Sequence, residues 1–383
     1  MKIYLDNGAT SYPKPECVYN AVNDYMRNNG ANPGRGNYSN AMDSDRLVYE
    51  TRKTAAKLFG AKKPGEIVFT SNATEAVNII LKGFLKNGDE VLTSNIEHNA
   101  MWRPLKKLED NRNIKINYFN VTKDGKVDLN EISDKLTAQI KLVAFVHGSN
   151  VLGNILPVAE ISKLAQKKNI PVFIDASQTA GVYPINVIDD GIDFLAFTGH
   201  KSMLGPTGTG GFYIRNGLYL DTLKEGGTGS MAKSPFQPDL PPDRYESGTL
   251  NIFGLAGLKA AVDYIHEAGV LKILEHERRL LSRLLRGLKE IPGVEIYGSL
   301  NPDEKLGIVS FNIKKRDPYE IASKLDENYG IMTRAGLHCA PRAHKIIGTE
   351  DRGAVRVSIG CFNTEEHIDL LLDALKNITA NEV

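Results

Sequence analysis

Two apolar segments of the sequence end directly before side chains that could do chemistry. Lys201 follows the apolar segment 194–197, after Thr198-Gly199-His200, and Asp175 follows the segment 171–174. Solvent is restricted beside such a segment, and desolvation lowers the pKa of a lysine and frees its amine as a nucleophile. A surface lysine at a turn is the structural alternative. An aspartate in this position could hold a protonated ring nitrogen, although a helix cap or an ion pair would explain it equally.

Two further candidates follow earlier apolar segments. Ser71-Asn72-Ala73-Thr74-Glu75 follows the segment 67–70, and a helix that begins there would offer free N–H groups to a phosphate. The alternative is a capping box with Asn72 as N-cap and Glu75 three residues later. His98, in Glu97-His98-Asn99, could stack on a flat heteroaromatic ring, although a lone histidine is more often structural.

The three cysteines, Cys17, Cys339 and Cys361, are too few for a disulfide framework and favour a reducing compartment. Cys339 lies near Arg334, His338, Arg342 and His344, and neighbouring cations lower a thiol pKa. A zinc site using Cys339, His338, His344 and Cys361 is conceivable, but no Cys-x-x-Cys spacing supports it, so we expect no metal. Cys17 is expected to be a small buried apolar residue.

The elements that must position these residues alternate between strand and helix. Such alternation predicts an α/β fold in which a mostly parallel sheet is covered by helices on both faces. The glycines at 205–211 do not form a dinucleotide-binding loop, because a strand pattern follows them rather than a helix. Strands are expected at 67–70, 90–93, 114–119, 141–146, 171–174, 194–197 and 212–214, with helices that include 74–84 and 157–168.

The pattern changes after about residue 251. Helices are expected at 257–268, 271–288, 319–327 and 365–378, and strands at 294–297, 306–312 and 355–359. This pattern predicts a smaller C-terminal α/β domain joined by a long helix. The predicted division is an N-terminal segment at 1–14 that packs with the small domain, a large domain at 15–255 and a small domain at 256–383.

The bulk composition excludes some classes of partner. The 383 residues carry 47 Lys and Arg against 46 Asp and Glu, a formal net charge of +1, which argues against nucleic acid and an anionic membrane surface. The first residues lack the long apolar stretch that is typical of a signal peptide, and no segment approaches the roughly 20 apolar residues that span a bilayer. A cytoplasmic protein is expected.

Taken together, the candidates describe one kind of site. Ligands bind outside the carboxyl ends of strands in open α/β sheets. A phosphate cradle, an acid for a ring nitrogen and an imine-forming lysine at that edge are the parts that pyridoxal 5'-phosphate requires, and we expect no other cofactor.

These residues resemble a known family. The chain is similar to the cysteine desulfurases, in the class V aminotransferase group of fold-type I pyridoxal phosphate enzymes, and looks closest to the subgroup that includes selenocysteine lyases. The resemblance runs from Tyr4-Leu5-Asp6-Asn7-Gly8-Ala9-Thr10 to Arg356-Val357-Ser358. Its most specific segments are 71–78, 97–99, 175–178, 198–201 and Arg334-Ala335-Gly336-Leu337-His338-Cys339-Ala340-Pro341.

The resemblance implies a fold-type I transferase with a seven-stranded type of sheet, and it implies roles for individual residues. Lys201 would bond the cofactor's aldehyde, Asp175 would pair with the ring nitrogen, His98 would stack on the ring and Gln178 would bond its oxygen. Cys339 would accept sulfur. The phosphate would be held by Ala73, Thr74, Thr198, His200 and, across a homodimer interface, Thr249. The substrate would be held by Asn150, Arg356, Arg334 and Asn37, with Asn150 also beside the cofactor.

The implied reaction converts L-cysteine to L-alanine and leaves a persulfide on Cys339 for a sulfur-acceptor protein, in iron–sulfur cluster assembly or other sulfur trafficking. The chain departs from many relatives at Leu337 and Asn37, where they carry histidine, which bears on the choice of substrate and acceptor. Three alternatives stay open: a selenocysteine lyase acting on L-selenocysteine, another class V aminotransferase or lyase, and a non-catalytic assembly partner that only keeps the fold.

Overall fold

The computed structural model describes residues 2–34 and 36–380. Its largest element is a seven-stranded sheet, in which only β8 runs antiparallel to its neighbours, as the alternating pattern predicts. In spatial order the strands are β2 (Ile67–Thr70), β8 (Gly210–Ile214), β7 (Phe194–Thr198), β6 (Val172–Asp175), β5 (Ile140–Val146), β3 (Glu90–Ser94) and β4 (Lys115–Phe119).

Both faces of this sheet are buried, because successive side chains of a strand point to opposite faces. Leu195 and Phe197 of β7 join the core on one face, whereas Phe194 and Ala196 join the core on the other. The first face packs on α2 (Ser39–Phe59), α5 (Leu129–Lys135), α6 (Val158–Gln166) and α7 (Ile252–Ala268). The second packs on α3 (Ala73–Phe84) and α4 (Asn99–Arg112).

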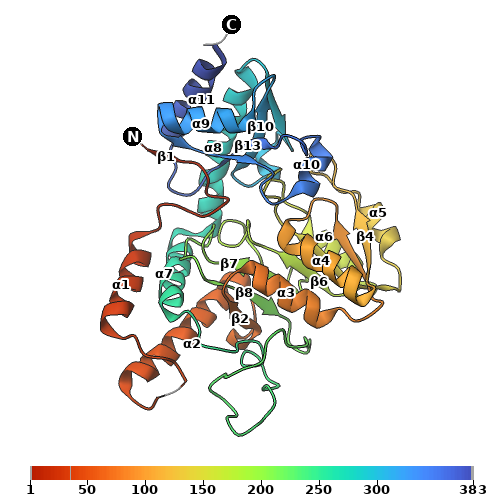
Figure 1. Cartoon of the computed structure of the whole chain (residues 1–383), viewed down its shortest axis with the longest axis vertical. Coiled ribbons are helices and arrows are strands. Elements are labelled where there is room, and N and C mark those ends of the chain that lie inside the picture. Colours follow the sequence, from red (N-terminus) through yellow and green to blue (C-terminus); the bar gives the residue numbers. More distant parts are fainter. Residues whose placement is uncertain (1, 35, 381–383) are drawn as a thin grey trace.

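A smaller antiparallel sheet lies in the C-terminal part of the chain, drawn in teal to blue in Figure 1. Its order is β12 (Arg334–Gly336), β13 (Ala354–Ser358), β10 (Ile308–Ile313) and β9 (Val294–Tyr297). It shares a core with α8 (Val270–Glu290), α9 (Pro318–Tyr329) and α11 (Glu365–Ala380). The predicted division at residue 256 falls within α7, which packs against α1 (Glu16–Asn28) and α2 and whose Leu258 and Val262 belong to the core of the large sheet.

The N-terminal residues lie with the small domain. β1 (Ile3–Tyr4) pairs in parallel with β11 (Ile331–Met332), and Leu5 N–H donates to Met332 O at 2.9 Å. The chain then crosses to the large domain, where Ser11 N–H donates to His200 O at 2.9 Å. The segment between them, residues 5–11, therefore runs along the boundary between the two domains.

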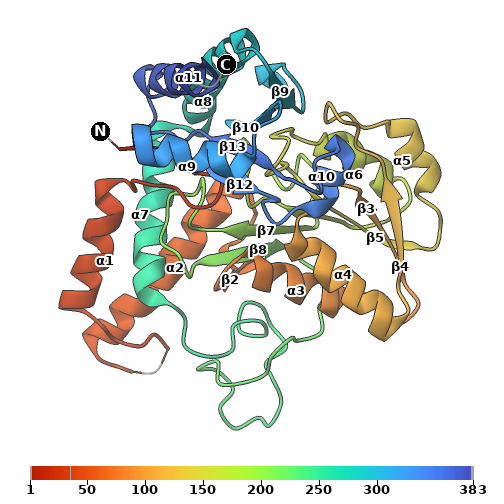
Figure 2. The same cartoon turned by 45° about the horizontal axis from the view of Figure 1, so that its top comes forward.

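Three other features bear on the site. α10 (Pro341–Ile347) belongs to the small domain but lies against the large one, close to α6 and α4 in Figure 2. Residues 215–250 form a long irregular segment away from the small domain (Figure 1). Among the described helices, none combines the length and apolarity needed to cross a membrane.

Candidate active site

A cavity of about 80 Å³ lies at the carboxyl ends of β5, β6 and β7, where the sequence predicted the site. The start of α3 and the residues around the start of α4 close its sides. Nine predicted site residues line it: Ala73, Thr74, His98, Asn150, Asp175, Gln178, Thr198, His200 and Lys201.

The start of α3 has the helix cap that the sequence offered as the structural interpretation. The side chain of Asn72 caps the helix by accepting from Glu75 N–H at 2.9 Å, and Glu75 in turn accepts from Ser71 N–H at 2.8 Å. Ala73 and Thr74, the first two residues of the helix, line the cavity. The cap therefore leaves the positive end of the helix available to an anion.

Asp175 is the last residue of β6 and is 2% exposed. Its Oδ1 accepts from Ser177 N–H at 2.9 Å, which fixes the carboxylate at the cavity wall. Gln178 lies next along the turn and donates from Nε2 to Gly8 O at 2.9 Å. This hydrogen bond ties the cavity wall to the N-terminal segment, a contact that the sequence did not predict.

Lys201 lines the cavity, and its surroundings change its acidity. The pKa of the amine is lowered to about 8, chiefly by desolvation; Asp175 opposes this effect, and the nearby Arg356 and Arg334 add to it. This is the direction the sequence predicted. Thr198 Oγ1 and His200 Nδ1, also on the cavity wall, are buried and have no hydrogen-bond partner in the described part of the chain.

His98 occupies the N-cap of α4, where its Nδ1 accepts from Ala100 N–H at 3.0 Å. Burial, followed by the charge of Lys201, lowers its pKa to about 4. The ring is therefore neutral near pH 7, and because Nδ1 accepts, the proton resides on Nε2.

Arg356 provides the charge on the small-domain side. It lies on β13, is 1% exposed, and donates from Nη2 to Asp6 Oδ1 at 2.6 Å and from Nη1 to Asn150 O at 3.2 Å. Its Nε is buried without a partner among the described residues. Asp6 comes from the N-terminal segment, and the tight apposition of Gly8 explains the need for glycine there, since a Cβ would lie 3.2 Å from the guanidinium carbon.

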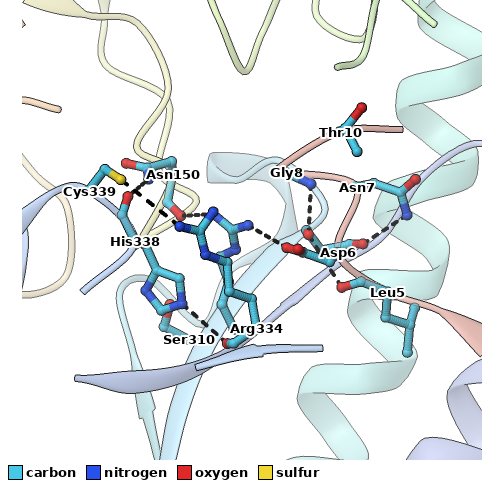
Figure 3. A network of polar contacts seen from close by, with 12 residues as sticks. Leu5, Asp6, Asn7, Gly8, Thr10, Asn150, Ser310, Arg334, His338 and Cys339 are labelled. Carbon is cyan, nitrogen blue, oxygen red and sulfur yellow. Dashed lines mark hydrogen bonds and ion pairs between the residues drawn. The ribbon is translucent and has the colours of Figure 1, made fainter. Parts of the chain in front are cut away.

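Asn150 connects this arginine to the cysteine segment. It lines the cavity, and its Nδ2 donates to His338 O at 2.7 Å. Figure 3 shows Asn150, His338, Cys339 and Arg334 gathered on one side, with Asp6 opposite. Arg334 Nη2 approaches Cys339 Sγ at 4.0 Å.

The thiol of Cys339 is exposed and lies on a sharp turn between β12 and α10. His338 and Cys339 have φ values of 51° and 57°, a left-handed conformation that is rare outside glycine. The ring of His338 is buried and contacts His344 Nε2 at 3.2 Å and Arg334 O at 3.2 Å. No group of three or more histidine, cysteine or acidic side chains suited to a metal ion occurs among residues 2–34 and 36–380.

The structure does not bring every predicted residue to the cavity. Asn37 is exposed before the start of α2, and Thr249 is exposed in the irregular segment; neither lines the cavity. Arg334, Cys339 and Arg356 do not line it either, and lie on its small-domain side. The expectation that Cys17 is buried is wrong: it is exposed on α1, because its neighbour Val18 takes the inward position. Cys361 is partly buried, and burial raises its pKa to about 12.

Two functional contacts were missed by sequence reasoning. Asp6 stood in the matching N-terminal segment, but nothing local indicated that it pairs with an arginine 350 residues away. Asn99 N–H donates to Cys339 O at 2.8 Å, which joins the start of α4 to the cysteine turn. Both contacts are long-range, so no periodicity or spacing could have revealed them.

Comparisons with known proteins agree with this geometry. The family described as aminotransferase class-V matches residues 3–371. A probable cysteine desulfurase of Methanothermobacter thermautotrophicus is 37% identical over 382 residues, covering 98% of this chain and 94% of its own. A cysteine desulfurase of Cronobacter sakazakii is 32% identical, with 98% and 93% covered.

Solved structures show the same similarity. The apo structure of a cysteine desulfurase from Thermococcus onnurineus NA1 superposes with a TM-score of 0.92 at 34% identity, covering 99% of this chain and 94% of the other. The cysteine desulfurase CsdA from Escherichia coli, in its S-sulfonic acid form, gives 0.88 at 26% identity, with 98% and 94% covered.

Proposed function

This chain belongs to the cysteine desulfurase branch of the class-V aminotransferase family, and from that premise we propose that it transfers sulfur from L-cysteine to Cys339 and releases L-alanine. The observation that carries the proposal is spatial. A desolvated lysine, a buried aspartate and a helix start share one cavity, and Asn150 joins that cavity to both a buried arginine and the segment of an exposed cysteine.

The enzymes of this family use pyridoxal 5'-phosphate, and the cavity fits that group. Thr198 Oγ1 and His200 Nδ1 are buried polar atoms without partners, and they lie on the same wall as the start of α3, so a phosphate would satisfy them. Ala73, Thr74, Thr198 and His200 would hold the phosphate, and Asp175, His98 and Gln178 would surround the ring. When bound, the cofactor supplies an electron sink that weakens bonds around the substrate's α-carbon.

Lys201 moves a proton at the substrate's α-carbon. With a pKa of about 8, its amine is partly neutral at physiological pH, whereas an ordinary lysine is almost wholly charged. Arg356 binds the substrate's carboxylate through its remaining N–H groups, because Nε has no partner and Nη1 and Nη2 each keep a second proton after donating to Asn150 O and Asp6. The arginine is thus oriented before the substrate arrives.

Cys339 takes the sulfur. Its thiolate attacks the substrate's sulfur, an Sγ–S bond forms and the substrate's C–S bond breaks. The bonding pair stays with carbon, which gains a proton and leaves as L-alanine, so atoms and electrons balance with a persulfide on Cys339. Because the thiol is exposed, an acceptor protein can reach it, for iron–sulfur cluster assembly or other sulfur trafficking.

A homodimer would complete the site. Thr249 is too exposed to serve its own cavity, and it borders two open hollows near α2 and β2. Glu246 anchors its segment through a buried pair with Arg52, at 2.6 Å. Large apolar side chains on the same irregular segment are exposed, including Phe236 at 80% and Leu240 at 72%, and a second copy would bury them. Thr249 would then reach the partner's phosphate.

The direct test measures both products. The purified protein is loaded with the cofactor and given L-cysteine and a reductant, and L-alanine and sulfide are measured for wild type and Cys339→Ala. We expect equal amounts of the two products from wild type and neither from the variant. Pyruvate in place of alanine would contradict the proposal in favour of a lyase. Undiminished turnover of L-selenocysteine by the variant, with none of L-cysteine by wild type, would favour a selenocysteine lyase.

A further inference from the structure

The segment that carries Cys339 is attached to the large domain by an aromatic clamp. Arg342, on α10 three residues after Cys339, places its guanidinium over two rings: 4.2 Å from the ring centre of Trp102 and 4.3 Å from that of Tyr118. Trp102 lies on α4 and Tyr118 on β4, with ring centres 5.9 Å apart. A planar guanidinium suits such stacking on aromatic faces.

Arg342 is held by stacking on both rings and by a hydrogen bond to the hydroxyl of Tyr118. Its Nε is buried and has no hydrogen-bond partner within residues 2–34 and 36–380. The two rings come from the large domain and the arginine from α10, which lies next to α4 in Figure 2, so the contact crosses the domain boundary beside the cysteine turn.

The turn itself needs support from outside. His338 and Cys339 both adopt left-handed φ values, and such strained residues persist only where the surrounding structure fixes them. On the N-terminal side, Asn150 Nδ2 holds His338 O at 2.7 Å and Asn99 N–H holds Cys339 O at 2.8 Å. On the C-terminal side, Ala340, Ala343 and Ile347 pack into the core of the large domain, and Arg342 adds a polar attachment at the edge of that packing.

The helix α4 connects two of the contacts that hold the cysteine turn to the lining of the cavity. α4 begins at Asn99, next to its cap His98, which lines the cavity, and Trp102 follows one turn after Asn99 on the same side of the helix. The position of the thiol relative to the cavity is therefore set through α4.

We propose that Arg342, Trp102 and Tyr118 are positioning residues that hold the Cys339 turn against the large domain, so that the thiol stands ready to capture the substrate's sulfur. This inference rests on the proposed desulfurase function. Releasing the clamp lets the strained turn relax, which moves Sγ away from the reacting sulfur, whereas Lys201, Asp175 and Arg356 keep their own supports. Sulfur capture slows, and binding of cofactor and substrate does not change.

The test compares Arg342→Ala with Lys345→Ala, which removes an exposed positive charge from the same helix without touching the rings. For Arg342→Ala, we expect kcat for alanine formation to fall roughly tenfold while KM stays within about twofold, because a small misplacement of a reacting atom is costly. Lys345→Ala keeps the wild-type values. Arg342→Lys, which keeps the charge but not the plane, falls between them, as does Trp102→Phe, which keeps one smaller ring.

Hydrogen exchange gives an independent readout of the clamp. The amide of Asn99 donates to Cys339 O, so it should exchange faster in Arg342→Ala than in Lys345→Ala. Wild-type rates and unchanged Asn99 exchange in Arg342→Ala would overturn the clamp while leaving the proposed function intact. The clamp would also be overturned if KM rose and cofactor was lost to the same extent in Arg342→Ala, Arg342→Lys and Trp102→Phe. Failure of the proposed function would show instead as wild type that makes no alanine.

Discussion

The site has two walls, a large-domain wall that carries Lys201 and a small-domain wall that carries Cys339. They hold their reactive groups in opposite ways. Lys201 follows a buried central strand, where desolvation lowers its pKa to about 8. Cys339 is exposed on a left-handed turn between short elements of the small domain. An amine must lose its proton to act, and burial achieves that. A thiol that hands sulfur to another protein must be reachable, so it is positioned by its neighbours instead of being buried.

The three cysteines differ in the same way, in how exposed and how well positioned their thiols are. Burial, followed by the charge of Glu277, raises the pKa of Cys361 to about 12, so its thiolate is scarce near neutral pH. Cys17 is exposed, but it lies on α1 and its pKa is also raised, chiefly by desolvation. Among the three, Cys339 alone combines exposure, a nearby arginine and attachment to the cofactor wall.

Removing the lysine should have the largest effect. Lys201→Ala should lower desulfuration about 10³-fold, as expected for the loss of a group that moves a proton, and should abolish the covalent link to the cofactor. Kinetics measure the loss of rate, and the absorption spectrum reports the loss of the covalent link. Lys305→Met is the matched control, since Lys305 is also buried with a lowered pKa but lies outside the cavity. If Lys305→Met lost the cofactor and Lys201→Ala kept it, Lys201 would not be the residue that binds the cofactor.

The lowered pKa of Lys201 predicts a pH profile. Only the neutral amine captures the cofactor's aldehyde, so below about pH 8 the capture rate of cofactor-free protein should fall about tenfold per pH unit. Above that pH the rate should level off. Capture is followed by absorbance across a pH series. A rate that keeps rising toward the pKa of an ordinary lysine, 10.5, would show that the wall does not desolvate the amine.

A smaller effect is expected where the two walls meet. Asn150→Ala removes the hydrogen bond to His338 O, a net loss of about 1 kcal/mol, so kcat/KM for L-cysteine should fall about fivefold. Asn130→Ala, at an exposed position on α5, serves as the control in the same kinetic assay. An Asn150→Ala variant with wild-type kcat/KM would show that the walls are positioned independently.

The sequence predicts the large-domain wall far better than the small-domain one. β7 is apolar up to its last residue, Thr198, and Lys201 follows three residues later, whereas β6 is apolar up to its last residue, Asp175, so pattern and chemistry coincide. On the other wall, β11 and β12 have two and three residues, too short to show a period, and no pattern indicates a left-handed turn at His338. The pairing of Asp6 with Arg356, and the Arg342 clamp, depend on tertiary contacts that local patterns do not encode.

The most direct test of the central claim locates the transferred sulfur. The cofactor-loaded protein is mixed with L-cysteine in the absence of reductant, digested, and examined by mass spectrometry. We expect the peptide containing Cys339 to gain the mass of one sulfur atom, the peptides of Cys17 and Cys361 to gain none, and one L-alanine to appear per sulfur. Added sulfur on Cys361, or alanine formed with no sulfur on Cys339, would show that Cys339 does not receive the sulfur.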